Sequence, residues 1–143
     1  MKPSKLLASL ALTAFAATTA HAGPVRADHP LLGTWKLAIP DTSCVETYRM
    51  RADGTSLVSS AEELAETEFE VADKPSEKGF YKWVDKLVRD NGKKDCSGQV
   101  TEPAKVTTYF ISMHPSGDMF IMCQAEDTKA CMGPFVRVKG SAI

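Results

Sequence analysis

Beyond residue 22 the chain contains only two histidines, His29 and His114. His114 lies close to Ser112, Ser116 and Asp118, which are the residue types of a Ser-His-Asp hydrolase. These residues are neighbours on one expected turn, and no Gly-x-Ser-x-Gly nucleophile elbow accompanies them. We interpret His114 as a turn-capping residue and expect no enzyme. A hydrolase would become credible only if His114 hydrogen-bonded a serine in a concave pocket.

Carboxylates fall into two groups along the expected strands. Glu66, Glu68 and Glu70 alternate with apolar residues and indicate a solvated, charge-paired outer face. Glu46 and Asp85 occupy inward positions instead, because Glu46 is in phase with Tyr48 and Asp85 with Trp83. Placing a carboxylate inside the barrel costs free energy unless it is paired or hydrated. Each therefore marks either a polar position in a pocket or a local ion pair.

A cluster of sulfur and imidazole groups in the last third raises the alternative of copper binding, since thioethers select Cu(I). Alternation along the strands divides this cluster between two faces, however, so methionine as core filler is the simpler interpretation. We expect no metal site and no cofactor. The residues concerned are Met113, His114, Met119, Met122, Cys123 and Met132.

The length and the charge of the chain are typical of one globular domain preceded by a signal peptide. Lys2 and Lys5 precede an apolar run that ends in Ala20-His21-Ala22, which predicts a signal peptide over residues 1–22 and a periplasmic or secreted protein. Its removal leaves 15 basic against 18 acidic residues, a charge of −3 that argues against a nucleic-acid partner. No later run approaches the roughly 18 apolar residues of a membrane span.

Alternating apolar residues predict eight short strands with no helix between them. Residues 23–32 form an expected flexible lead-in, and residues 33–140 form the domain. Turn signals fall evenly, as in Ala52-Asp-Gly54 between the second and third runs. This pattern favours an all-β, eight-stranded antiparallel up-and-down barrel over a sandwich. The expected strands cover residues 33–39, 45–51, 55–60, 64–72, 80–89, 106–113, 119–124 and 134–139.

The four cysteines, Cys44, Cys96, Cys123 and Cys131, test that topology. Their even number in an oxidising compartment favours two disulfides, and the absence of a Cys-x-x-Cys knuckle argues against zinc. All four fall in or beside connections at one end of an up-and-down barrel, as bonding partners must. Of three possible pairings we favour Cys123 with Cys131, and Cys44 with Cys96.

Gly33-Thr-Trp35 on the first strand and Arg137 on the last carry a resemblance to the lipocalin-like, or calycin, barrels. The chain resembles a small exported bacterial member. In that family a Gly-x-Trp closes one barrel end and a late arginine packs across the indole, which implies the same cation–π contact between Trp35 and Arg137.

The resemblance implies a cup whose mouth is braced by the disulfides and whose cavity binds a small apolar ligand. Bulky inward residues could equally fill the interior, so a packed core and a cavity both remain open. The alternative function is a protein-binding module, such as an inhibitor or immunity-like factor, that uses the disulfide-braced rim loops. The expected ligand-binding residues are Trp35, Tyr48, Tyr81, Trp83, Tyr109 and Met122.

Overall fold

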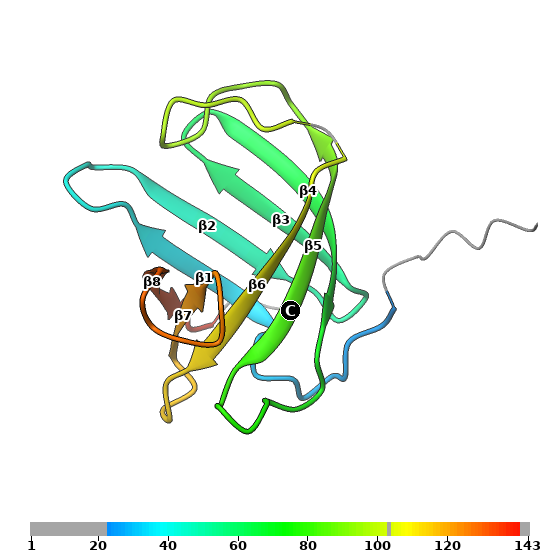
Figure 1. Cartoon of the computed structure of the whole chain (residues 1–143). Coiled ribbons are helices and arrows are strands. Elements are labelled where there is room, and N and C mark those ends of the chain that lie inside the picture. The colour runs from blue at the N-terminus through cyan, green and yellow to red at the C-terminus, as the bar shows by residue number, and fades with distance from the viewer. Residues whose placement is uncertain (1–22, 103, 141–143) are drawn as a thin grey trace, which may run out of the picture.

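The computed structural model describes residues 23–102 and 104–140, so the expected signal peptide at residues 1–22 lies outside the described residues. Eight antiparallel strands close into a barrel in chain order, with β1 paired to β8 (Figure 1). The predicted fold class is therefore confirmed. The strands are β1 (Gly33–Ala38), β2 (Val45–Met50), β3 (Thr55–Ser60), β4 (Glu63–Val71), β5 (Tyr81–Asp90), β6 (Val106–Met113), β7 (Met119–Cys123) and β8 (Cys131–Arg137).

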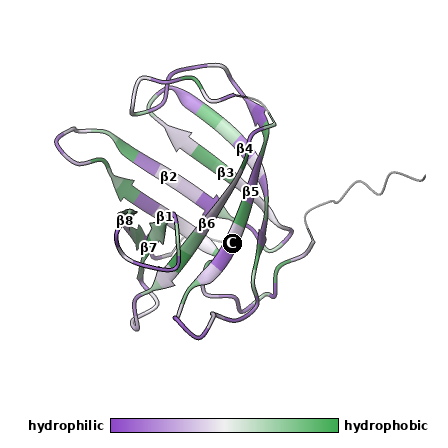
Figure 2. Cartoon of the chain, in the orientation of Figure 1, coloured by the Kyte–Doolittle hydropathy of each residue, from purple (hydrophilic) through white to green (hydrophobic). Residues whose placement is uncertain are grey.

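Alternation along the strands sorts side chains between the interior and solvent, as the banding in Figure 2 shows. On β4, Phe69 is 1% exposed whereas Leu64 on the outer face is 62% exposed. A register shift between Glu66 and Thr67 lies in the pairing of β4 with β5. It does not disturb the alternation, because Thr67 and Phe69 both remain buried.

The large apolar side chains concentrate at the closed end, which carries the β2–β3, β4–β5 and β6–β7 connections. Phe120 and Phe135 stack with ring centroids 4.4 Å apart, and Trp35 meets Phe120 edge-on at 4.7 Å. All three are at most 1% exposed. Burying each such ring stabilises the fold by about 1.5–3 kcal/mol, so this cluster is the main core.

The segment before β1, which we expected to be a flexible lead-in, packs against the barrel. Leu31 and Leu32 are buried in the core at the closed end, and the segment runs beneath the barrel in Figure 1. His29 is also buried: its Nδ1 accepts the Leu31 N–H at 3.1 Å, and its Nε2–H donates to the Ala72 carbonyl at 3.1 Å. Burial lowers the pKa of His29. The Leu31 N–H is a local partner, but only the folded barrel brings the Ala72 carbonyl to His29.

Arg137 joins that segment to the last strand. Its guanidinium lies 4.1 Å from the Trp35 ring centroid and donates to the carbonyls of Pro30 at 2.7 Å and Leu32 at 2.8 Å. The Trp35 indole N–H donates to the Leu31 carbonyl at 2.8 Å. The contact that the resemblance implied is thus present, and the eight-stranded barrel is compatible with a lipocalin-like fold.

The last strand begins earlier than predicted, at Cys131 instead of Pro134. Cys131 pairs across the ladder with Cys123, the last residue of β7, so the disulfide joins two strand ends and not a loop to a strand. The three residues before Pro134, Cys131-Met-Gly133, have no alternation of their own. Pairing with β7 brings them into the sheet.

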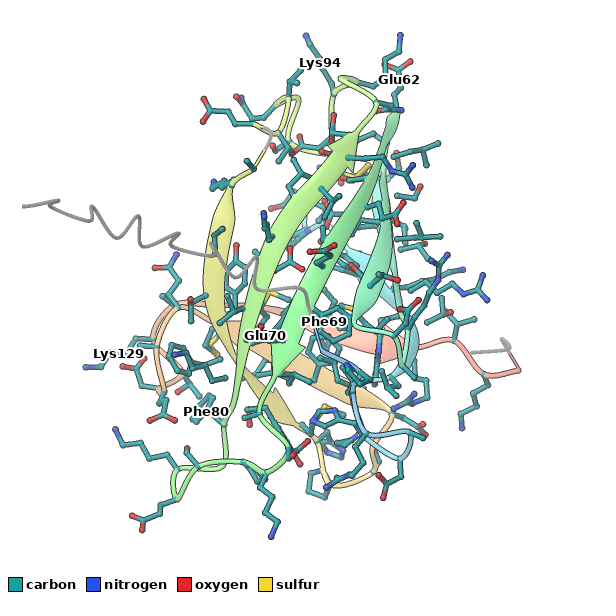
Figure 3. The ribbon with its side chains drawn as sticks, turned by 90° about the vertical axis from the view of Figure 1, so that its right-hand side faces the viewer. Glu62, Phe69, Glu70, Phe80, Lys94 and Lys129 are labelled. Carbon is teal, nitrogen blue, oxygen red and sulfur yellow. A yellow bond between two sulfur atoms is a disulfide. The ribbon has the colours of Figure 1, made fainter. Side chains whose placement is uncertain are left out.

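The open end carries the other four connections, and both disulfides lie there. Cys44 bonds Cys96 with a Cα–Cα distance of 5.8 Å, and Cys123 bonds Cys131 at 4.0 Å, as predicted. The Glu62 N–H also donates to the Lys94 carbonyl at 3.2 Å. Figure 3 shows these two residues together at this end, far from Phe80. The β1–β2 and β3–β4 connections are therefore both tied to the β5–β6 connection, while the second disulfide closes the β7–β8 connection on itself.

Candidate functional site

A cavity of about 580 Å³ occupies the half of the barrel nearest the open end. Small interior side chains such as Val58, Ala65 and Thr107 line it, while the large rings gather at the closed end. The interior is therefore not filled by its own side chains. Its lining includes Leu37, Glu46, Tyr48, Glu63, Thr67, Trp83, Asp85, Leu87, Thr101, Lys105, Tyr109, Met122 and Met132.

Four of the six expected ligand-binding residues line this cavity, namely Tyr48, Trp83, Tyr109 and Met122. Trp83 and Tyr109 pair across β5 and β6 with ring centroids 6.1 Å apart. The other two expected residues lie elsewhere.

Trp35 is fully buried beneath Arg137, and Tyr81 packs edge-on against His29 at 5.1 Å. Both sit toward the closed end, because inward alternation does not say how far along the barrel a side chain lies. Trp35 therefore belongs to the core at the closed end, and Tyr81 packs against that core.

Asp85 projects into the cavity from β5, as its alternation with Trp83 predicted. The Thr67 hydroxyl donates to its Oδ1 at 2.6 Å, and the Ser56 hydroxyl in turn contacts Thr67 Oγ1 at 2.7 Å. Ser56 and Thr67 are buried, so the pair forms a relay of hydroxyls that ends on the carboxylate. Burial raises the pKa of Asp85 to about 6, although the Thr67 hydrogen bond opposes the shift.

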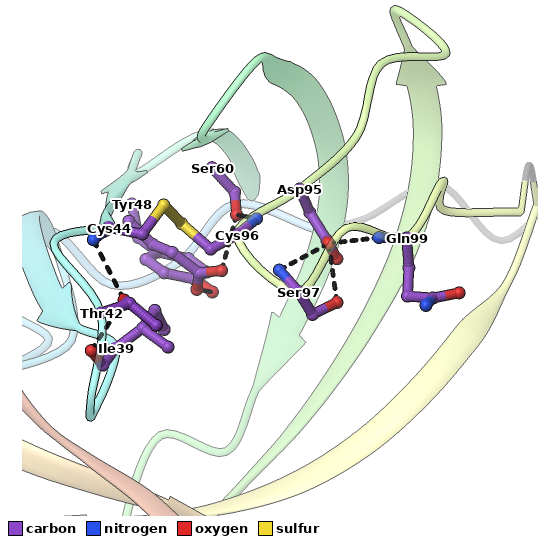
Figure 4. The surroundings of a disulfide bond; sticks show 10 residues. Ile39, Thr42, Cys44, Tyr48, Ser60, Asp95, Cys96, Ser97 and Gln99 are labelled. Atoms are coloured by element: carbon purple, nitrogen blue, oxygen red, sulfur yellow. Dashed lines mark hydrogen bonds between the residues drawn. A yellow bond between two sulfur atoms is a disulfide. The ribbon is translucent and has the colours of Figure 1, made fainter.

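Glu46 is held from two sides near the mouth. Tyr48 Oη donates to Glu46 Oε2 at 2.5 Å, and Ser60 Oγ donates to Oε1 at 2.6 Å. Ser60 also accepts the Cys96 N–H at 2.9 Å, which connects the carboxylate to the disulfide loop (Figure 4). Burial, followed by the charge of Glu46, raises the pKa of Tyr48. The phenol therefore stays a donor.

Glu63 is a third cavity carboxylate, and the sequence analysis missed it. It is 5% exposed at the start of β4, where Thr101 Oγ1 donates to its Oε1 at 2.5 Å. Burial, with the carboxylate of Asp90 nearby, raises the pKa of Glu63. The available signal was the alternation of β4, which places Glu63 in phase with Ala65 and Thr67.

The charges of the cavity are not balanced by the protein. Among residues 23–102 and 104–140, Glu46, Glu63 and Asp85 form no salt bridge with any cationic side chain. Lys105, an exposed residue, is the cation in the lining. A further polar group is unsatisfied: the indole N–H of Trp83, in a side chain 3% exposed, has no acceptor in the described part of the chain.

The expected turn around His114 lies at the opposite end of the barrel. The Ser116 hydroxyl contacts His114 Nδ1 at 2.9 Å, but both residues are exposed, and Ser116 does not line the adjoining depression. Asp118 pairs with Lys139 at 3.3 Å and not with the imidazole. The geometry is that of a capped turn.

The copper alternative gains nothing from the placement of its residues. Met122 and Met132 line the cavity, whereas His114 lies at the closed end and Cys123 is consumed in a disulfide. In the described ranges, no three or more His, Cys, Asp or Glu side chains are grouped to hold a metal ion. No helix among those same residues is long and apolar enough to cross a membrane.

No family model matches the chain, and no curated protein or solved structure is significantly similar to it. The candidate site is therefore defined by its own geometry. It can enclose a small molecule against aromatic rings, offer hydroxyls and carboxylates to that molecule, and exclude much of the surrounding water.

Proposed function

We propose that this protein is an exported, lipocalin-like binding protein that holds a small ligand in the cavity of its barrel. The observation that carries the proposal is the cavity itself. Its volume of about 580 Å³ lies within the range of roughly 300–1,000 Å³ that is typical of small-molecule sites. Trp83, Tyr109 and Met122 supply the apolar contact surface such sites use.

The disulfides support the rest of the proposal. Two of them, with no free cysteine in the described part, indicate an oxidising compartment, and a periplasmic or secreted location agrees with the leader expected at residues 1–22. They also brace the mouth. Cys96 lines the cavity and is tied to β2 through Ser60 and Glu46, which fixes this part of the rim to the barrel wall.

Titration with the neutral fluorescent probe N-phenyl-naphthylamine tests this function. We expect its emission to rise on binding to the wild type. Ala65→Phe should abolish that rise, because Ala65 lines the cavity and a phenyl ring there would occupy the ligand volume. Leu64→Phe is the matched control, since its neighbour Leu64 is 62% exposed on the outer face.

The proposal fails if the wild type does not bind the probe. It also fails if Ala65→Phe and Leu64→Phe bind the probe equally well while both variants remain folded by near-UV circular dichroism. In either case the cavity would not be a ligand site.

A further inference from the structure

We propose that the cavity selects small organic cations, in which an amine or ammonium group is joined to an apolar body. This inference rests on the proposed function and adds a charged group to the small apolar ligand that the sequence predicted. It is carried by the contrast between the aromatic walls and three cavity carboxylates that the protein leaves without a cationic partner.

Asp85 is the anchor for the ligand charge. It lies on β5 two residues from Trp83, and register places Thr107 of β6 opposite it. In the described ranges Thr67 supplies its one hydrogen bond, so the carboxylate retains acceptor capacity inside the barrel. Asp85 is half-buried, and a partly desolvated carboxylate without a counter-charge is costly, so a ligand ammonium would supply that charge.

Glu46 and Glu63 extend the negative field from Asp85 to the mouth. The hydroxyls of Tyr48 and Ser60 orient Glu46, and that of Thr101 orients Glu63, but hydroxyls do not neutralise a carboxylate. Among the described lining residues, carboxylates outnumber the single cation, the exposed Lys105, and a cleft in which one sign of charge predominates concentrates ions of the opposite sign. Cations are therefore drawn into this cavity and anions are disfavoured.

The aromatic walls favour the same ligands. The faces of Trp83 and Tyr109 can contact an ammonium group by cation–π attraction and an apolar body by stacking. The indole N–H of Trp83 has no acceptor in the described part of the chain, so the protein does not use this donor elsewhere.

Isothermal titration at neutral pH with three isosteres tests the inference: naphthylethylamine is cationic, naphthylethanol neutral and naphthylacetate anionic. We expect the amine to bind at least about tenfold more tightly than the alcohol, a difference of about 1.4 kcal/mol, and the acetate to bind most weakly. Asp85→Asn should remove the preference by weakening the amine while leaving the alcohol within about twofold.

Two further variants make the test specific. Glu46→Gln should reduce the amine preference in part. Glu70→Gln removes a carboxylate from the exposed outer face of β4 and should leave all three affinities unchanged. It controls for the net charge of the protein.

The outcomes separate this inference from the function on which it rests. If the alcohol or the acetate binds as tightly as the amine, or if Asp85→Asn keeps the preference, the cation inference is wrong while the binding function stands. The same holds if the neutral fluorescent probe binds but the amine does not. If neither the probe nor any isostere binds, the proposed function itself fails.

Discussion

A Cβ atom on Gly33 would lie 2.7 Å from Nη1 of Arg137. Gly33 also has a φ of +125°, a backbone conformation that residues other than glycine rarely adopt. The glycine therefore leaves room for the guanidinium that lies over Trp35 and donates to the Leu32 carbonyl. The Gly-x-Trp pattern of β1 has its physical reason in this close approach.

Gly33→Ala should consequently lower the free energy of unfolding by about 3–5 kcal/mol, because backbone strain is added to the loss of a charged hydrogen bond. Urea denaturation followed by tryptophan fluorescence measures the change. Gly79→Ala is the control: Gly79 also has a positive φ, of +83°, but nothing lies within 4 Å of the added methyl group. Its expected loss is about 1–2 kcal/mol. Equal losses would contradict the role of Arg137.

The two disulfides should differ in their contribution to stability, because they close loops of different length. The Cys44–Cys96 bond spans 52 residues and the Cys123–Cys131 bond spans 8. Loop-closure entropy then predicts losses of about 4 and about 2.5 kcal/mol when each pair is replaced by serine. Denaturant unfolding of the two double variants measures both losses of unfolding free energy. A larger loss for the Cys123–Cys131 pair would contradict the prediction.

Removing the charge of Asp85 should stabilise the unliganded protein at high pH. Burial raises its pKa in the fold from the ordinary 3.8 to about 6, so the stability associated with the protonated carboxyl is complete below about pH 4 and is lost as the pH rises through about 6. Asp85→Asn should therefore unfold at a higher temperature than wild type near pH 8, with little difference near pH 4. A constant difference across this range would show that Asp85 does not titrate as stated.

Binding of naphthylethylamine should weaken as the pH falls through about 6, since protonation of Asp85 removes the charge that attracts the ligand. The titratable groups that share the cavity with Asp85 are Glu46 and Tyr48 on β2, Glu63 on β4, Tyr109 on β6, and Asp95 and Lys105 between β5 and β6. Glu63 also has a raised pKa, and its protonation acts in the same direction. Titration of naphthylethanol over the same range is the control and should show no comparable loss.

Alternation and turn signals predicted eight strands, their closure into a barrel and the favoured pairing of the cysteines, and the structure confirms these apart from the earlier start of β8. Alternation is a local property, because successive side chains on a strand point to opposite faces whatever the rest of the chain does. The same rule placed Glu46 and Asp85 inside the barrel. It would also have placed Glu63 there if the predicted strand had begun one residue earlier, as β4 does.

Only the tertiary structure decided where the barrel is empty. Trp35 and Tyr81 alternate inward just as Trp83 and Tyr109 do, yet the first pair packs at the closed end and the second lines the cavity. Height along the barrel depends on strand stagger and on side chains from distant strands that meet across the interior. The burial of His29 likewise depends on a carbonyl 43 residues away. Local periodicity carries no information about such non-local packing, so the cavity and its unbalanced charge became visible only in the folded barrel.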